Sequence, residues 1–315
     1  MNSVRRSPSR RRDNLAARVP RRPHPSVRAR VRAMRERFVF NREMRLRLMS
    51  AVVLVPLVLF STWFGEYSFL FIVLLTAALL LLEWLRMIGA SHLIHLHVVG
   101  WAMLAVIALC AHALPVWPSV AVVFGAAVVS GVAAWGDRSD IAVRWVAAGT
   151  LYSGLAMVSL IALRKGDDGF GAVVFVLLIA WASDTAAFFV GRQLGGPKLW
   201  PRVSPAKTWS GAIGGLVAGV AFGAAVAFWL SVPITLAALF LAAAVAIAAQ
   251  LGDLAESAAK RHFMVKDAGT IIPGHGGVMD RVDGVVAAAF LSAALGAFMA
   301  GDAPASGLLR FMGAQ

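Results

Sequence analysis

Long apolar runs recur along most of the chain after its first 47 residues, and they limit the fold more than any other feature of the sequence. An α-helix needs about 20 consecutive apolar residues to cross the hydrocarbon core of a bilayer. The candidate spans are residues 48–64, 69–85, 97–114, 120–134, 143–163, 170–190, 212–230, 232–249 and 285–300. Because the fourth run is short and follows the third closely, eight spans with one re-entrant hairpin are the alternative. The pattern predicts an all-α, polytopic membrane bundle of about nine helices.

The composition agrees with a membrane protein and excludes an ordinary soluble domain. Apolar residues make up 59% of the chain, charged residues only 15%, and the mean hydropathy is +0.76. The single cysteine, Cys110, lies within an apolar run. We therefore expect no intrachain disulfide, no thiolate metal site and no redox chemistry.

The first 45 residues are predicted to form a disordered, arginine-rich cytoplasmic tail. The net charge of the chain is +14, and sixteen arginines lie in the first 47 residues against three acidic residues. Prolines and the lack of a periodic apolar face indicate disorder. Such a tail holds its end of the chain at the anionic cytoplasmic face of the membrane. A nucleic-acid partner is not expected, because only Phe38 and Phe40 are available for base stacking.

The positions of the basic residues predict the orientation of the spans. Outside the tail, arginine and lysine gather at alternate span ends, which should be cytoplasmic. The amino terminus is then cytoplasmic and the carboxyl terminus lies outside. We expect residues 46–165 to form amino-terminal transmembrane helices and residues 166–315 to form a catalytic transmembrane region. The polar loops of that region, 191–211 and 252–283, both face the cytoplasm, and we place the protein in the cell inner (plasma) membrane.

Asp184 is the first candidate for chemistry, because it lies within the apolar run 170–190. An ionised carboxylate at such a depth costs several kcal/mol unless it is paired or bound to a metal. We interpret Asp184 as a metal or cation contact in a polar cavity. The alternative is a buried hydrogen bond through Ser183 or Thr185 that fixes helix packing.

The loop 191–211 combines glycines with spaced cations and hydroxyls. Such a loop can bring backbone amides and positive charges to phosphate oxygens. Its candidate substrate-binding residues are Arg192, Lys198, Ser204, Lys207 and Thr208. The alternative is a loop that is basic for topological reasons, with glycines that serve helix packing.

The segment that follows the eighth span carries the strongest signal. If its helix continues, Asp253, Glu256, Ser257 and Lys260 share one face at spacings i, i+3, i+4 and i+7. A hard divalent cation such as Mg²⁺ takes one or two protein carboxylates together with substrate phosphates, and Asp253 and Asp280 could supply them. The remaining candidates are cations for a triphosphate and a leaving pyrophosphate, Lys260, Arg261, Lys266 and Arg281, and substrate-binding residues, Ser257, His275, Gly276 and Gly277. His275 is left between phosphate contact, proton transfer and a local hydrogen bond.

In their order along the chain, these residues closely resemble two signatures of the phosphatidate cytidylyltransferases, also called CDP-diacylglycerol synthases. The carboxy-terminal signature is carried by Ser257, Lys260, Arg261, Lys266, Asp267, Pro273, Gly274, His275, Gly276, Gly277, Asp280, Arg281 and Asp283. The upstream block is carried by Asp184, Ala187, Phe188, Gly191, Arg192, Gly195, Ser204, Pro205, Lys207, Thr208 and Gly211. Ser210 stands where the family commonly has glutamate, which leaves the role of that position open.

The resemblance implies transfer of a cytidylyl group from CTP to phosphatidic acid, which gives CDP-diacylglycerol and pyrophosphate. It implies Mg²⁺ and a second, monovalent cation such as K⁺ near paired aspartates. By matching position, Asp253 and Asp280 would contact the metal, and we add Asp283 from the same signature. The expected partners are CTP, phosphatidic acid and membrane lipids, and a homodimer is one assembly left open. The alternative hypotheses for the function are a CTP-dependent lipid kinase, a transporter and an inactive scaffolding paralogue.

Overall fold

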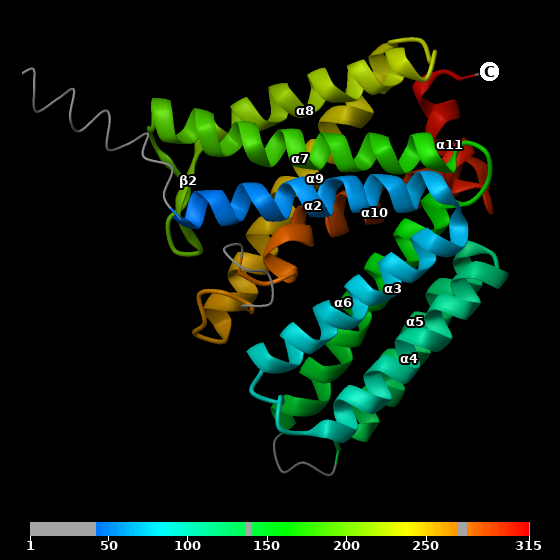
Figure 1. Ribbon diagram of the computed structural model, residues 1–315, viewed down its shortest axis with the longest axis vertical. Helices are drawn as coiled ribbons and strands as arrows, with labels where there is room; N and C mark the ends of the chain where they lie inside the picture. Colours follow the sequence, from blue (N-terminus) through cyan, green and yellow to red (C-terminus); the bar gives the residue numbers. More distant parts are fainter. Residues whose placement is uncertain (1–41, 136–139, 270–275, 315) are drawn as a thin grey trace, which may run out of the picture. The chain divides into compact units, whose positions relative to one another are not determined.

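The computed structural model describes residues 42–135, 140–269 and 276–314, and these are almost entirely helical (Figure 1). The tail predicted to be disordered lies outside this part of the chain up to residue 41, and so does His275. The helices are α2 (Arg42–Phe64), α3 (Glu66–Met87), α4 (Ile94–Ala113), α5 (Val116–Ala133), α6 (Asp140–Arg164), α7 (Gly169–Leu194), α8 (Trp209–Trp229), α9 (Leu236–His262), α10 (Met279–Ala300) and α11 (Pro304–Met312). The predicted polytopic helical fold is confirmed.

Among the described residues, 8 helices are long and apolar enough to cross a membrane. They are α3 to α10, and helix α2 adds a shorter apolar part at Val52–Phe64. Helix α5, the doubtful fourth candidate, has 18 residues and qualifies as a span by itself. This length favours nine helices over a re-entrant hairpin.

Two elements were not expected from the sequence. The loop between α7 and α8 contains an antiparallel hairpin of β1 (Lys198–Trp200) and β2 (Ser204–Thr208). Helix α7 can end there because Gly195 and Gly196 adopt positive φ angles of 64° and 102°, which glycine reaches without strain. The second element is α11, a helix of 9 residues that follows the last span. The hairpin matters for the site because it folds the basic loop back over the end of α7.

Helix α8 packs against α7 and α9 through a row of glycines. The row is Gly211, Gly215, Gly219 and Gly223. A Cβ atom at Gly215 would lie 2.7 Å from the backbone oxygen of Ser183 on α7, and one at Gly219 would lie 2.6 Å from Cβ of Ala246 on α9. Small residues at every fourth position allow helix backbones to approach closely in a membrane. The three helices therefore pack as one group, which brings the polar ends of α7 and α9 together.

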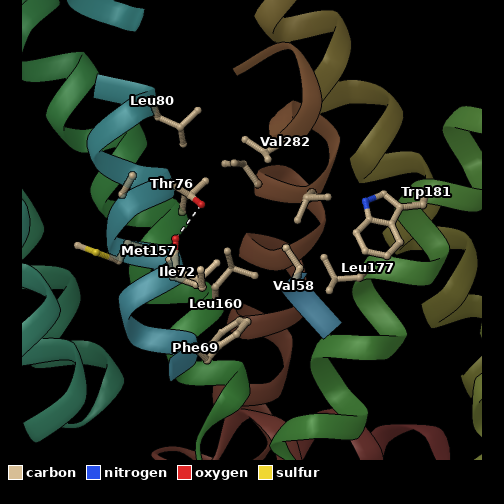
Figure 2. Close-up of a pocket in the computed structure, with 15 residues that line it drawn as sticks. Val58, Phe69, Ile72, Thr76, Leu80, Met157, Leu160, Leu177, Trp181 and Val282 are labelled. Carbon is tan, nitrogen blue, oxygen red and sulfur yellow. Dashed lines mark hydrogen bonds between the residues drawn. The ribbon is translucent and has the colours of Figure 1, made fainter. Parts of the chain in front are cut away.

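A small internal void, lined by apolar side chains, lies within the bundle between α2, α3, α6, α7 and α10 (Figure 2). Its volume is about 90 Å³, and no charged residue lines it. Figure 2 shows Phe69, Met157, Trp181 and Val282 around it, with the hydroxyl of Thr76 bonded back to the carbonyl of Ile72 at 2.8 Å. This cavity belongs to the packed interior.

Candidate active site

Helix α9 extends beyond its apolar part and ends at His262, which confirms the predicted continuation. The continuation places Asp253, Glu256 and Lys260 on one helical face. Glu256 and Lys260 are only 4% and 9% exposed. A charged helical face is therefore turned into the protein, where its charges need partners.

Helices α9 and α10 are in backbone contact next to these charges. A Cβ atom at Gly252 would lie 2.5 Å from the backbone oxygen of Asp283 and 2.7 Å from Cβ of Ala287. Only glycine fits at this crossing. Because Gly252 adjoins Asp253, the close approach brings the two helices' carboxylates to one place.

Three carboxylates meet at this crossing, and we call Asp253, Glu256 and Asp283 the acidic triad. One oxygen from each lies within 4.8 Å of the others. Glu256 and Asp283 are buried, at 4% and 7% exposure. Anionic groups held so close in a buried place repel one another unless a cation lies among them, and oxygen ligands suit a hard divalent cation. The donor set therefore fits the expected metal.

Lysines border the triad on both sides. Lys207 of β2 forms an ion pair with Asp253. The ammonium of Lys260 lies 2.8 Å from Oε2 of Glu256 and 2.6 Å from Oδ1 of Asp280. Each lysine offsets part of the negative charge and leaves carboxylate oxygens available to a cation.

Asp280 lies outside the acidic triad. Besides Lys260, its carboxylate accepts hydrogen bonds from the backbone N–H of Gly277 at 2.9 Å and of Ala268 at 3.4 Å. Of the predicted metal ligands, Asp253 and Asp283 lie in the acidic triad. Asp280 instead forms an ion pair with Lys260 and accepts hydrogen bonds from the segment before α10. The metal role of Asp280 stays a prediction.

Glu83 of α3 is a site residue that the sequence did not single out. Its side chain is fully buried, and its two oxygens accept hydrogen bonds from the backbone N–H groups of Val278 at 2.9 Å and Met279 at 2.8 Å. A carboxylate at this place satisfies the first donors of α10 and complements the positive end of that helix. A Cβ atom at Gly277 would lie 2.6 Å from Oε2 of Glu83, so the segment passes directly over the carboxylate. The rule that singled out Asp184, an acid within an apolar run, also applies to Glu83.

A cavity of about 590 Å³ lies between α7, the hairpin, α8 and α9. Its polar lining residues are Asp184, Arg192, Lys198, Lys207, Thr208, Gln250 and Asp253. Its volume lies within the usual range of small-molecule sites, about 300–1,000 Å³. We call it the cationic cavity. It brings residues of the first polar loop to the acidic triad, and Asp184 contributes a second carboxylate to its wall.

Hydroxyl and amide groups fix the shape of the cationic cavity. Thr208 caps α8 by accepting a hydrogen bond from the N–H of Gly211 at 3.1 Å. Ser210 bonds to Thr208 at 3.0 Å and donates to the carbonyl of Gly195 at the end of α7. Gln250 donates to Ser183 of α7 and to the carbonyl of Ala212 on α8, both at 3.1 Å. The serine at position 210 thus ties the hairpin to its flanking helices.

The other predicted residues lie at varying distances from these contacts. Ser257 lies 3.5 Å from Asp253, and Gly276 passes close to Asp280. Arg261 is exposed and donates to the carbonyls of Val203 and Val265.

Three further predicted residues lie away from the cationic cavity. Lys266 and Arg281 are exposed and Ser204 is half-buried, and none of the three lines that cavity. The structure does not bring the whole predicted set of cations to one point.

Together, these features define a multi-pass membrane protein with a carboxylate site suited to a metal-bound phosphate substrate. The comparisons with known proteins agree with that class. The model of the Cytidylyltransferase family matches residues 45–299, and the chain belongs to this family. It is 41% identical over 258 residues to a phosphatidate cytidylyltransferase of Brucella suis biovar 1 (strain 1330), which covers 81% of this chain and 93% of the relative. A phosphatidate cytidylyltransferase of Bacillus subtilis (strain 168) is 38% identical over 143 residues, 45% of this chain and 53% of the relative.

Proposed function

We propose that this protein transfers the cytidylyl group of CTP to phosphatidic acid, forming CDP-diacylglycerol and pyrophosphate. The observation that carries the proposal is the acidic triad beside the cationic cavity, in a chain of the cytidylyltransferase family. The relatives named above are phosphatidate cytidylyltransferases, and one of them aligns over 81% of this chain.

The residues divide into a metal-holding group and a phosphate-binding group. Asp253, Glu256 and Asp283 would hold Mg²⁺, and Asp184 is the carboxylate that we assign to a second, monovalent cation such as K⁺. When bound, a divalent cation neutralises phosphate charge and aligns the reacting groups. The cations of the cavity would contact the triphosphate, namely Arg192, Lys198 and Lys207.

The chemical step needs no protein nucleophile. A phosphate oxygen of phosphatidic acid attacks the α-phosphorus of CTP, a new P–O–P bond forms, and the bond from the α-phosphorus to the oxygen of the β-phosphate breaks. Pyrophosphate leaves with the electron pair of that bond. Because two polyanions must meet, Lys260 and Lys207 lower the repulsion at the two sides of the acidic triad.

We further propose that the protein lies in the inner membrane with this site at the cytoplasmic face. The positive-inside distribution of Arg and Lys supports this orientation, since the basic loop at 191–211 contributes to the cationic cavity. CTP is then available on the side where the lipid headgroup lies.

Product analysis tests the proposal against its rivals. The purified protein is incubated with α-³²P-labelled CTP, phosphatidic acid and Mg²⁺. We expect labelled lipid and unlabelled pyrophosphate. A lipid kinase would instead release labelled CDP, and a scaffold or a transporter would give no labelled product.

A matched pair of variants tests the triad. Asp283→Asn should lower turnover by on the order of 100-fold or more and raise the Mg²⁺ concentration for half-maximal activity. Asp302→Asn is the control, because Asp302 is an exposed aspartate in the turn after α10. Equal activity of both variants would refute the assignment of the triad.

A further inference from the structure

A third cavity, of about 320 Å³, lies between α3, α6, α9 and α10. Its lining is mostly apolar and includes Trp84, Leu155, Ala255, Val286 and Phe290. It differs from the cationic cavity in having no lysine or arginine among its lining residues. We call it the apolar cavity. Because all four helices are candidate spans, its walls are suited to a ligand that comes from the bilayer.

The two cavities meet at the acidic triad. Asp253 lines the cationic cavity, whereas Glu256 and Asp283 line the apolar cavity. The oxygens of these three residues lie within 4.8 Å of one another. Ligands in the two cavities would therefore have their phosphates beside the same three carboxylates.

Tyr152 supplies a polar group within the apolar cavity. Its ring stacks on Trp84 with centroids 5.7 Å apart, and the indole N–H of Trp84 is in turn fixed to the carbonyl of Trp145 at 2.8 Å. The Tyr152 hydroxyl is buried and has no hydrogen-bond partner among the described residues. A buried hydroxyl without a partner is costly, so its presence on the cavity wall points to a ligand that accepts its hydrogen bond.

We infer that the apolar cavity holds the acylated glycerol end of the lipid substrate, with the Tyr152 hydroxyl donating to an oxygen of its glycerol phosphate ester. This inference rests on the proposed function and assigns its lipid side. The first carbons of the acyl chains contact Leu155, Val286 and Phe290, and the rest of each chain stays in the bilayer. The lipid phosphate then lies at Glu256 and Asp283, opposite the nucleotide.

The small internal void described with the fold does not fit this role. The space in Figure 2 measures about 90 Å³ and has no carboxylate in its lining. It therefore has neither the room for a glycerol ester nor a link to the acidic triad.

Two alanines offer a matched test, because both are exposed and each lines one cavity. Ala255 lines the apolar cavity and Ala206 lines the cationic cavity. We expect Ala255→Leu to raise the KM for phosphatidic acid in mixed micelles at least 5-fold and to leave the KM for CTP within 2-fold. Ala206→Leu should do the reverse. Tyr152→Phe should raise the KM for phosphatidic acid about 5- to 10-fold, with the KM for CTP unchanged.

The outcomes separate this inference from the proposed function. An inactive parent protein would overturn the proposed function itself. An active parent in which Ala255→Leu raises the KM for CTP, or in which neither Ala255→Leu nor Tyr152→Phe changes the KM for phosphatidic acid, would overturn only the lipid assignment.

A measurement on the unaltered protein does not depend on the folding of variants. A phosphatidic acid with a diazirine near the glycerol end of one acyl chain is photolysed in the presence of the protein. We expect the label on peptides of α6 and α10. Labelling confined to the hairpin 198–208 would overturn the inference.

Discussion

The carboxylate of Glu83 should stabilise both the fold and the site, and its replacement tests this directly. Glu83 reaches from α3 to the first N–H groups of α10, which lie 195 and 196 residues further along the chain. The same segment carries Gly277 and Asp280, and the carboxylate of Asp280 accepts a hydrogen bond from Lys260. Loss of the Glu83 contacts should therefore loosen the start of α10 and, through Asp280, the lysine beside the triad.

The magnitude follows from the two hydrogen bonds. A hydrogen bond to a charged group contributes about 1.5–3 kcal/mol, and a buried donor left without a partner costs a similar amount. In Glu83→Gln, the amide oxygen can keep one N–H, but the amide NH₂ faces the other. We expect a loss of about 2 kcal/mol for Glu83→Gln and about 4 kcal/mol for Glu83→Ala. For a protein of 315 residues, 2 kcal/mol corresponds to a fall in Tm of about 3 °C.

Thermal unfolding in detergent, followed by tryptophan fluorescence, measures the change, and initial rates at varied Mg²⁺ measure its effect on the site. Glu66→Gln is the control on the same helix, because Glu66 accepts one hydrogen bond, from the exposed N–H of Gly166 at 3.2 Å. Its Tm should change by less than about 1.5 °C. If Glu83→Gln unfolds within 1 °C of the parent and keeps its kcat, the positioning role of Glu83 is wrong.

Three further predictions concern packing, charge and capping. Gly252→Ala should separate α9 from α10 and abolish activity, whereas Gly125→Ala, with nothing within 4 Å of its Cβ position, should keep full activity in the same assay. Lys260→Met should lower the yield of folded protein on gel filtration, because it leaves the buried carboxylate of Glu256 without its ion-pair partner and removes one partner of the half-buried Asp280, at a cost of about 3–5 kcal/mol, while exposed Lys198→Met should fold normally. Thr208→Ala should remove the cap of α8 and destabilise the protein by about 1 kcal/mol, seen as a small fall in Tm.

The membrane fold could be predicted from the sequence because a span is a local property. About 20 apolar residues in a row are sufficient to indicate a transmembrane helix, whatever its neighbours are. The charged face of α9 was predictable for the same reason, since Asp253, Glu256 and Lys260 lie within two helical turns. Both predictions needed only helical geometry.

The partners of those charges depend on how distant helices pack, and the sequence does not state them. Lys260 pairs with Asp280, 20 residues away across a loop, and Glu83 caps a helix 195 residues away. The metal roles of Asp253 and Asp280 were expected from matching positions and stay predictions, whereas the crossing at Gly252, which puts Asp283 beside Asp253, could not be read from the sequence. The hairpin was missed because its strands are only 3 and 5 residues long, too short for a periodic pattern.

The glycine row on α8 has a consequence for how this helix can evolve. At positions 211, 215, 219 and 223 any side chain would push a neighbouring helix away, while Ile213, Val217 and Phe222 on other faces are 59%, 64% and 49% exposed. A saturation library along α8 should therefore give a tolerance profile that repeats every four residues, with glycine alone surviving at each minimum and, apart from Gly214 beside Val190, most apolar residues accepted between them. The amino-acid sequence of α8 should therefore vary little along the glycine row and vary widely on the exposed faces.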